Sequence, residues 1–234
     1  MTEKPIAIVT GVGPGTGAAI VKRFSAGGFR IIALARSADL INSLAQEIPD
    51  VHAVTCDVSD ESQVRTVVAD VKGRFGAPEV LVHNAVGGGW GSFREIDPKM
   101  LKGNFEVNVM GLLYLAREVA PDMIDRGKGA ILVTGNTSSI RGKANFAGFA
   151  PTKAAQRILA ESIALDIGPL GVHVAYLLID AVIDTPRMRA RISDKPDEFF
   201  IKPAAIADEL YHLYGQDRSA WSFLTELRPF RENW

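Results

Sequence analysis

Short apolar runs alternate with longer amphipathic segments along most of this 234-residue chain. Such alternation is typical of strand–helix–strand units, in which helices cover both faces of a parallel sheet. The length suits one domain spanning residues 1–234, and no linker, repeat or low-complexity tract divides the sequence. The sequence therefore predicts an α/β protein with a Rossmann-type, doubly wound parallel sheet.

The predicted elements follow from the two hydrophobic periods. Helices are expected near 15–27, 38–48, 60–73, 98–126 (in one or two pieces), 149–167 and 203–215. Strands are expected at 6–9, 31–34, 51–55, 80–82, 131–133 and 172–178, with a last edge strand at 222–227. Residues 187–198 have mixed charge, and no element is placed there.

Composition excludes several classes of function. The 26 basic and 27 acidic residues nearly cancel without forming a basic run, so no nucleic-acid partner is expected. Cys56 has no partner for an internal disulfide, and no Cys/His cluster has metal-ligand spacing, so no metal is expected. There is no signal-like segment and no run of 18 apolar residues, so the protein is expected to be soluble and cytoplasmic, without a membrane partner.

A glycine-rich turn follows the first expected strand. Its spacing is Thr10-Gly11-x-x-x-Gly15-x-Gly17, and a helix-forming segment begins directly after it. Glycines allow a tight turn and a close approach to a pyrophosphate, while the helix N-terminus offers free N–H groups to the anion. The turn is interpreted as a dinucleotide-binding site, the alternative being an ordinary strand-to-helix turn.

The end of the second expected strand bears on the choice of cofactor. Rossmann proteins that prefer NAD place a carboxylate here to bind the ribose 2′-hydroxyl, whereas this chain has Arg36 followed by Ser37. An arginine would instead pair with a 2′-phosphate. The prediction is therefore NADP(H), and the alternative is that Arg36 is a solvated surface residue.

Two further strand ends carry polar groups, in Cys56-Asp57-Val58 and His83-Asn84-Ala85. Together with the glycine turn, these motifs resemble the short-chain dehydrogenase/reductase superfamily over residues 5–186. The resemblance also includes Asn108-Val109-Met110-Gly111, Thr152-Lys153-Ala154-Ala155 and Ile183-Asp184-Thr185-Pro186. Val86 departs from the family, which usually has a glycine after Asn-Ala.

The resemblance implies roles for individual residues. Asp57 would hold the adenine amino group, Asn84 and Ala85 would line the adenosine ribose, and Thr185 would meet the nicotinamide carboxamide. Lys153 would hold the nicotinamide ribose. The full set of expected cofactor-binding residues is Gly11, Gly15, Thr16, Gly17, Arg36, Ser37, Asp57, Val58, Asn84, Ala85, Lys153 and Thr185.

The family's catalytic pattern is broken in this chain. Family members use a tyrosine four residues before the lysine as the acid–base group, a spacing that puts both side chains on one helix face. The residue four before Lys153 is Phe149, and the longer spacing of related enoyl-acyl-carrier reductases leads to Phe146. Neither side chain can transfer a proton.

The family's serine is also out of register. Its usual offset leads to Asn136, whereas Ser139 stands three residues before Gly142, as a family serine typically does. Ser139 is preferred, with Asn136 and Ser138 as competitors. Asn108 is expected within a helix, where asparagine is unfavourable, which indicates another role. The candidate catalytic residues are Asn108, Ser139 and Lys153.

These observations lead to two hypotheses of function. The first is an NADP(H)-dependent oxidoreductase that acts on a carbonyl, alcohol or activated alkene of a small apolar molecule. The second is a catalytically silent NADP(H)-binding regulatory protein. The resemblance also implies a homo-oligomer, a dimer or a tetramer, formed through the long helices around 104–126 and 150–167.

Overall fold

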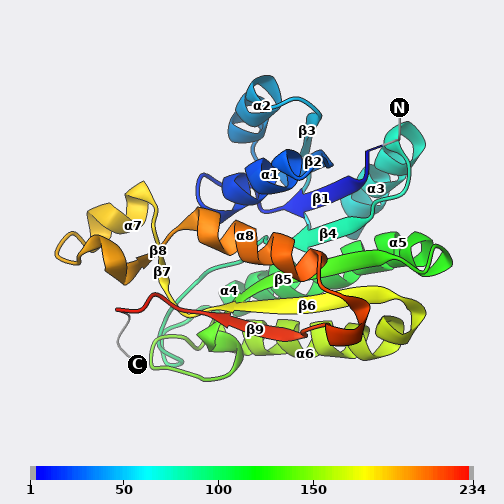
Figure 1. Ribbon diagram of the computed structural model, residues 1–234. Coiled ribbons are helices and arrows are strands. Elements are labelled where there is room, and N and C mark those ends of the chain that lie inside the picture. Colours follow the sequence, from blue (N-terminus) through cyan, green and yellow to red (C-terminus); the bar gives the residue numbers. More distant parts are fainter. Residues whose placement is uncertain (1–3, 232–234) are drawn as a thin grey trace.

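The computed structural model describes residues 4–231, and at its centre lies a seven-stranded sheet with the order β3-β2-β1-β4-β5-β6-β9. All neighbouring strands of this sheet run parallel. Helices cover both of its faces (Figure 1). The predicted α/β class with a doubly wound Rossmann-type sheet is confirmed.

The elements of the described residues follow in chain order. The strands are β1 (Ile6–Thr10), β2 (Arg30–Ala35), β3 (Val51–Thr55), β4 (Val80–His83), β5 (Gly129–Asn136), β6 (Val172–Ile179), β7 (Val182–Ile183), β8 (Phe200–Ile201) and β9 (Leu224–Leu227). The helices are α1 (Thr16–Ala26), α2 (Ala38–Glu47), α3 (Glu61–Phe75), α4 (Pro98–Phe105), α5 (Gly111–Asp125), α6 (Ala150–Ile167), α7 (Pro186–Arg191) and α8 (Pro203–Tyr214).

Two hydrophobic cores, one on each face, hold the sheet between its helices. The first packs α1, α2 and α8 against the sheet, with Phe24 and Leu210 fully buried. The second packs α3, α5 and α6 against the opposite face, with Leu115 and Ala160 fully buried. Strands that are apolar on both sides, such as β1 and β4, are typical of a sheet covered on two faces.

Two regions differ from the predicted elements. The segment 98–126 consists of α4 and α5 joined by a π-helical turn over Glu106–Met110, a distortion that is frequent at functional sites. On either side of Thr185, the two-stranded β7–β8 pair and the short helix α7 were not predicted. The pairing of Val182 with Phe200 depends on contacts distant in sequence, which local periodicity does not encode.

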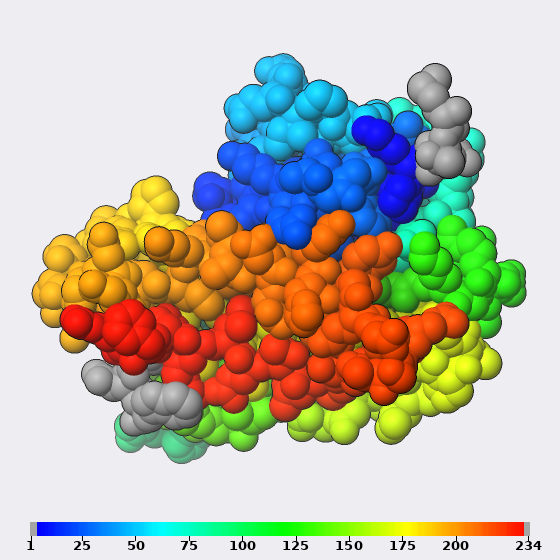
Figure 2. All heavy atoms as spheres, viewed as in Figure 1, coloured from blue at the N-terminus to red at the C-terminus, as the bar shows by residue number. Residues whose placement is uncertain are grey.

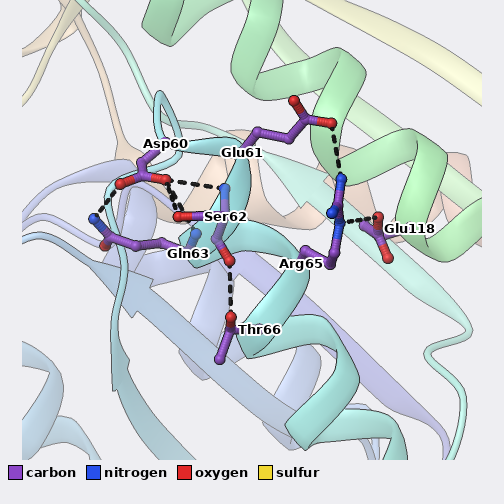
Figure 3. A network of polar contacts seen from close by, with 7 residues as sticks. All are labelled: Asp60, Glu61, Ser62, Gln63, Arg65, Thr66 and Glu118. Carbon is purple, nitrogen blue, oxygen red and sulfur yellow. Dashed lines mark hydrogen bonds and ion pairs between the residues drawn. The ribbon is translucent and has the colours of Figure 1, made fainter.

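Helix α3 begins at a strong cap that fixes the chain beyond β3 (Figure 3). Asp60 accepts hydrogen bonds from the backbone N–H groups of Ser62 and Gln63, at 2.9 and 3.1 Å. These bonds, with those from the two side chains, lower the pKa of Asp60 to about 2. Arg65 pairs with Glu61 on α3 and with Glu118 on α5, which joins the two helices.

The C-terminal part of the chain closes one face and one edge of the sheet. Helix α8 lies beside α1 (Figures 1 and 2). Between them, Arg23 pairs with Asp208 at 2.7 Å and stacks on the ring of Tyr211. Strand β9 then pairs with β6 at the sheet edge. None of the helices within 4–231 combines the length and the apolar character needed to cross a bilayer.

Candidate active site

The glycine turn after β1 is built by close backbone contacts. Gly11 has φ +64°, and a Cβ there would lie 2.5 Å from Ala85 Cα. A Cβ on Gly17 would lie 2.6 Å from both Gly11 O and Val12 Cα. These two glycines therefore allow the turn to pack on itself and on the end of β4.

The same turn forms one wall of a cavity of about 720 Å³ at the carboxyl ends of the strands. A Cβ on Gly13 would meet no atom within 4 Å, so this position leaves space for a ligand. The hydroxyl of Thr16 is buried without a hydrogen-bond partner among residues 4–231, at the start of α1. Free donors at a helix N-terminus fit the pyrophosphate of a dinucleotide.

Ten of the twelve expected cofactor-binding residues line this cavity. Lys153 and Thr185 are the two that do not. The ten are Gly11, Gly15, Thr16, Gly17, Arg36, Ser37, Asp57, Val58, Asn84 and Ala85. Apolar side chains, which carry no chemical signature of their own, complete the lining, and they include Val12, Leu34, Val107 and Ile183.

Arg36 lies at the rim of the cavity, at the end of β2. Its side chain is exposed and forms no ion pair within the described residues. Ser37 follows as the N-cap of α2, and its side chain makes no capping hydrogen bond. The guanidinium and the start of α2 are thus both available to an anion, as a 2′-phosphate would require.

The polar residues at the ends of β3 and β4 are already engaged within the protein. Asp57 Oδ1 accepts hydrogen bonds from the backbone and the hydroxyl of Ser59, at 3.0 and 2.7 Å. Asn84 donates to Gly11 O at 2.9 Å and accepts from the Thr134 hydroxyl at 3.1 Å. The Asn84 amide therefore ties together the ends of β1, β4 and β5, and its side chain supports the cavity wall.

Lys153 points into the protein from the first turn of α6. It is 2% exposed, and its Nζ donates to Thr134 O at 3.0 Å and to Gln156 Oε1. No carboxylate pairs with it among residues 4–231. Burial disfavours the charged form and lowers the pKa of Lys153 to about 7.

Gln156 connects Lys153 to the π-helical turn that carries Asn108. Its Nε2 donates to Asn108 O at 2.8 Å, while its Oε1 accepts from Lys153. Gln156 is fully buried, so both ends of its amide are used inside the protein. Sequence reasoning missed this residue, although a polar side chain three positions after Lys153 on a buried helix face was a usable signal.

The side chain of Asn108 joins the loop after β4 to the start of α6. Asn108 exchanges two hydrogen bonds with the backbone of Gly87, at 2.9 and 3.0 Å. It also donates to the hydroxyl of Thr152 at 2.8 Å, which in turn donates to Phe149 O. Asn108 is fully buried and thus positions the two segments around Lys153.

The three candidates for the family's serine differ in their hydrogen bonds. Ser139 Oγ donates its proton to Asn136 O at 2.7 Å, which leaves no proton for a substrate in this arrangement. Asn136 is the last residue of β5, and its Oδ1 accepts from Ser138 N at 3.0 Å. Its Nδ2 makes no hydrogen bond within the described chain, so Asn136 has free donors.

Phe149 lies four residues before Lys153, at the position where the resemblance implies a tyrosine. Phe149 is 4% exposed at the N-cap of α6, and its ring centroid lies 5.6 Å from that of Trp90. Trp90 itself is half exposed. Phe146, the other position considered, is only half buried and lies in the loop before α6.

The segment that carries Thr185 is fixed by ion pairs. Arg189 binds both oxygens of Asp184, at 2.7 and 2.9 Å, and pairs with Asp197 at 2.6 Å. The guanidinium lowers the pKa of Asp184 through these hydrogen bonds. Thr185 caps α7 by accepting from Met188 N, and its methyl group lies beside Gly15.

Taken together, these residues provide a dinucleotide-sized cavity beside a buried lysine and an amide with free donors. Comparison with known proteins agrees with this geometry. The short chain dehydrogenase family profile matches residues 5–196. L-xylulose reductase from Bos taurus is 31% identical over 189 residues, which are 80% of this chain and 75% of that protein.

Two solved structures extend the comparison to the whole chain. A short-chain dehydrogenase from Rhodopseudomonas palustris is 30% identical, with a TM-score of 0.82, and the match covers 97% of this chain and 99% of the other. An alcohol dehydrogenase from Thermococcus sibiricus, complexed with 5-hydroxy-NADP, is 26% identical, with a TM-score of 0.88 and 99% of each chain covered.

Proposed function

Because the chain belongs to the short chain dehydrogenase family, we propose that it is an NADP(H)-dependent oxidoreductase of a carbonyl, alcohol or activated alkene. The observation that carries the choice of cofactor is the cavity lined by the glycine turn and Arg36. No Asp or Glu takes the place of Arg36 at the end of β2 to favour a free 2′-hydroxyl. The complex of the Thermococcus sibiricus enzyme with 5-hydroxy-NADP supports this choice.

When bound, the cofactor supplies or accepts the hydride. The protein must then stabilise charge on the substrate oxygen and move one proton to or from it. Asn136 is our choice for the first task, because its Nδ2, at the carboxyl end of β5, makes no hydrogen bond to the part of the chain that the structure describes. Ser139 is set aside because its proton is bound to Asn136 O.

Lys153 is our choice for the second task. With a pKa of about 7, its ammonium group can release a proton at neutral pH, which an ordinary lysine does not do. Lys153 Nζ donates a hydrogen bond to Thr134 O. Thr134 lies on β5, two residues before Asn136. In this proposal, Asn136 takes the role that the family's serine has, and Lys153 takes the role of its tyrosine.

The function is tested by following NADPH oxidation with a panel of ketones, quinones and enones. We expect turnover by the wild type, a loss of about 10²-fold or more in kcat for Lys153→Met and Asn136→Ala, and a much smaller loss of kcat for Ser139→Ala, whose hydroxyl is bonded to Asn136 O. Calorimetry with NADPH separates loss of binding from loss of chemistry. Tight NADPH binding without any turnover would instead favour a catalytically silent regulatory protein.

A further inference from the structure

A second cavity, of about 870 Å³, lies between the start of α6 and two neighbouring loops. One loop follows β4 and the other follows β5, and both lie near the carboxyl ends of the strands (Figure 1). Their backbones are joined by hydrogen bonds from Gly91 N to Asn145 O, at 2.8 Å, and from Ala147 N to Gly91 O, at 3.3 Å. This cavity shares no lining residue with the cavity beside the glycine turn, which we call the cofactor cavity after its proposed ligand.

The charged residues that line the second cavity are all basic. Arg94, Arg141, Lys143 and Arg157 line it, and no Asp or Glu does. We call this cavity the basic pocket. The whole chain has a net charge of −1 and therefore no general excess of basic residues. The basic residues are thus gathered specifically around this pocket.

The nearby carboxylates neutralise only part of this charge. Arg157 pairs with Glu161 at 3.1 Å. Arg141 lies 3.8 Å from Asp180, which also pairs with Arg228 at 2.6 Å. The side chains of Arg94 and Lys143 form no ion pair within residues 4–231. At least two cationic groups are therefore available to a ligand.

Apolar groups lie among these cations. Phe93 is 80% exposed and Ile140 is 53% exposed, which is unusual for large apolar side chains. Phe146 and Ala150 also line the basic pocket. Its volume falls within the range of small-molecule sites. This combination of surfaces suits a molecule with an apolar body and an acidic end.

The basic pocket lies next to the proposed chemistry. Ser138 and Ser139 line it, and they lie two and three residues after Asn136, the last residue of β5. Ser139 O also receives a hydrogen bond from Arg157 at 3.4 Å, which connects the cationic side of the pocket to this loop. A substrate held here by its acidic end would extend its apolar body along the two loops.

We propose that the basic pocket binds the carboxylate of a small organic acid, whose apolar body carries the reacting carbonyl or alcohol. Arginine and lysine recognise carboxylates through charge-assisted hydrogen bonds, and Arg94 and Lys143 are the groups free to form them. Binding of the acid stands on the pocket alone, whereas its assignment as substrate depends on the proposed oxidoreductase function.

The test uses 4-benzoylbutyrate, an aromatic ketone with a carboxylate, and its uncharged methyl ester. Calorimetry is done on the full chain loaded with NADP⁺, at low and high salt. We expect the acid to bind about tenfold more tightly than the ester at low salt, with a smaller difference at high salt. Phenyl phosphate serves as a third ligand, to compare a phosphate with the carboxylate.

Variants show where the acid binds. Lys143→Glu and Arg94→Glu should each remove the preference for the acid, whereas Lys22→Glu, the same charge change on an exposed residue of α1, should leave it intact. Equal binding of acid and ester, no binding of either at millimolar concentration, equal effects of all three variants, or a preference for phenyl phosphate over the acid would overturn the proposal.

Turnover is measured separately on the same ligands. Preferential binding and reduction of 4-benzoylbutyrate would support both the pocket and its role in substrate recognition. Preferential binding without reduction of this ketone, in a protein that does reduce other ketones, would keep the pocket as an acid site and overturn its role as the substrate site. If no ketone is reduced at all, the proposed function fails while the calorimetric result still decides the pocket.

Discussion

Gln156 accepts a hydrogen bond from Lys153 three residues earlier on α6, and it is the only side chain to which Lys153 Nζ is bonded within the described residues. At the other end of the same amide, Gln156 Nε2 donates a hydrogen bond to Asn108 O. A neutral amide thus stands where a buried lysine would otherwise need a carboxylate. The proposed proton donor therefore has a neutral acceptor beside it, while burial lowers its pKa.

Substitutions of Gln156 should therefore shift the pKa of Lys153 in opposite directions. Gln156→Glu adds a negative charge and should raise that pKa, whereas Gln156→Leu removes an acceptor and should lower it below about 7. The pH profile of kcat/KM should move by about one unit or more to higher pH in the first variant and to lower pH in the second. Unchanged profiles in both variants would show that Gln156 serves packing alone.

The pH dependence of stability gives a test that needs no activity. Folding lowers the pKa of Lys153 from its ordinary value of 10.5 to about 7, so the unfolded chain binds more protons between these values. The free energy of unfolding should therefore rise with pH across this window, by up to about 1.4 kcal/mol per pH unit, and fall as pH returns toward 7.

This contribution should be absent in Lys153→Met. Urea unfolding of the cofactor-free protein at pH 7 and pH 9 measures it as the difference between wild type and variant, which cancels the other titrating groups. A difference that does not change with pH would mean that Lys153 keeps an ordinary pKa in the folded protein.

Arg36 should determine the choice between the two nicotinamide cofactors. We expect NADPH to bind at least about tenfold more tightly than NADH, because Arg36 forms no ion pair with any residue of 4–231 and can bind the 2′-phosphate at the cavity rim. Arg36→Asp should reverse the order in calorimetry. Lys22→Asp makes the same charge change on α1 and should leave the preference as it is. Equal affinities for the two cofactors in the wild type would refute the assignment.

Restoring the family's phenol should increase carbonyl reduction. Phe149→Tyr places a hydroxyl on the same helix as Lys153, one turn earlier, and general acid catalysis is worth about 10²-fold or more. The half-buried Phe146 provides the control, since Phe146→Tyr puts the same group in the loop before α6. If the two variants change kcat equally, or Phe149→Tyr has no effect, the site does not use the family's acid–base geometry.

Two glycines of the cofactor turn should respond differently to the same substitution. A Cβ on Gly17 would lie 2.6 Å from backbone atoms, so Gly17→Ala should reduce the free energy of unfolding by about 1–3 kcal/mol. A Cβ on Gly13 would meet no atom within 4 Å. The Gly13→Ala variant should therefore have the free energy of unfolding of the wild type. It should bind NADPH more weakly, because Gly13 lines the cavity. Equal losses of stability would contradict this division.

The grouping of residues around the cavity of about 720 Å³ could be predicted in detail because each part of its lining is encoded locally. The Gly11–Gly17 turn, Arg36 and the groups at Asp57 and Asn84 each follow one strand, and a parallel sheet brings the strand ends to one edge. The surrounding strands and most helices were likewise evident from hydrophobic period. Their exact ends were less so, since β5 continues to Asn136, three residues beyond the expected strand.

The substrate end could not be predicted in the same way. The loop between β5 and α6 takes its shape from backbone bonds to Gly91, some fifty residues earlier in the chain. The choice among Asn136, Ser138 and Ser139 likewise depends on which hydrogen bonds the folded loop makes. The partnership of Lys153 with Gln156 and Asn108 requires a helix and a π-helical turn to meet, which spacing alone does not specify.

The backbone bridge between Gly91 and Phe146 has a dynamic consequence. Because the loops after β4 and β5 share these hydrogen bonds, thermal fluctuations of one are transmitted to the other. We therefore expect a ligand that immobilises either loop to reduce the conformational entropy of both. Its dissociation rate should then respond to substitutions in the loop that it does not touch.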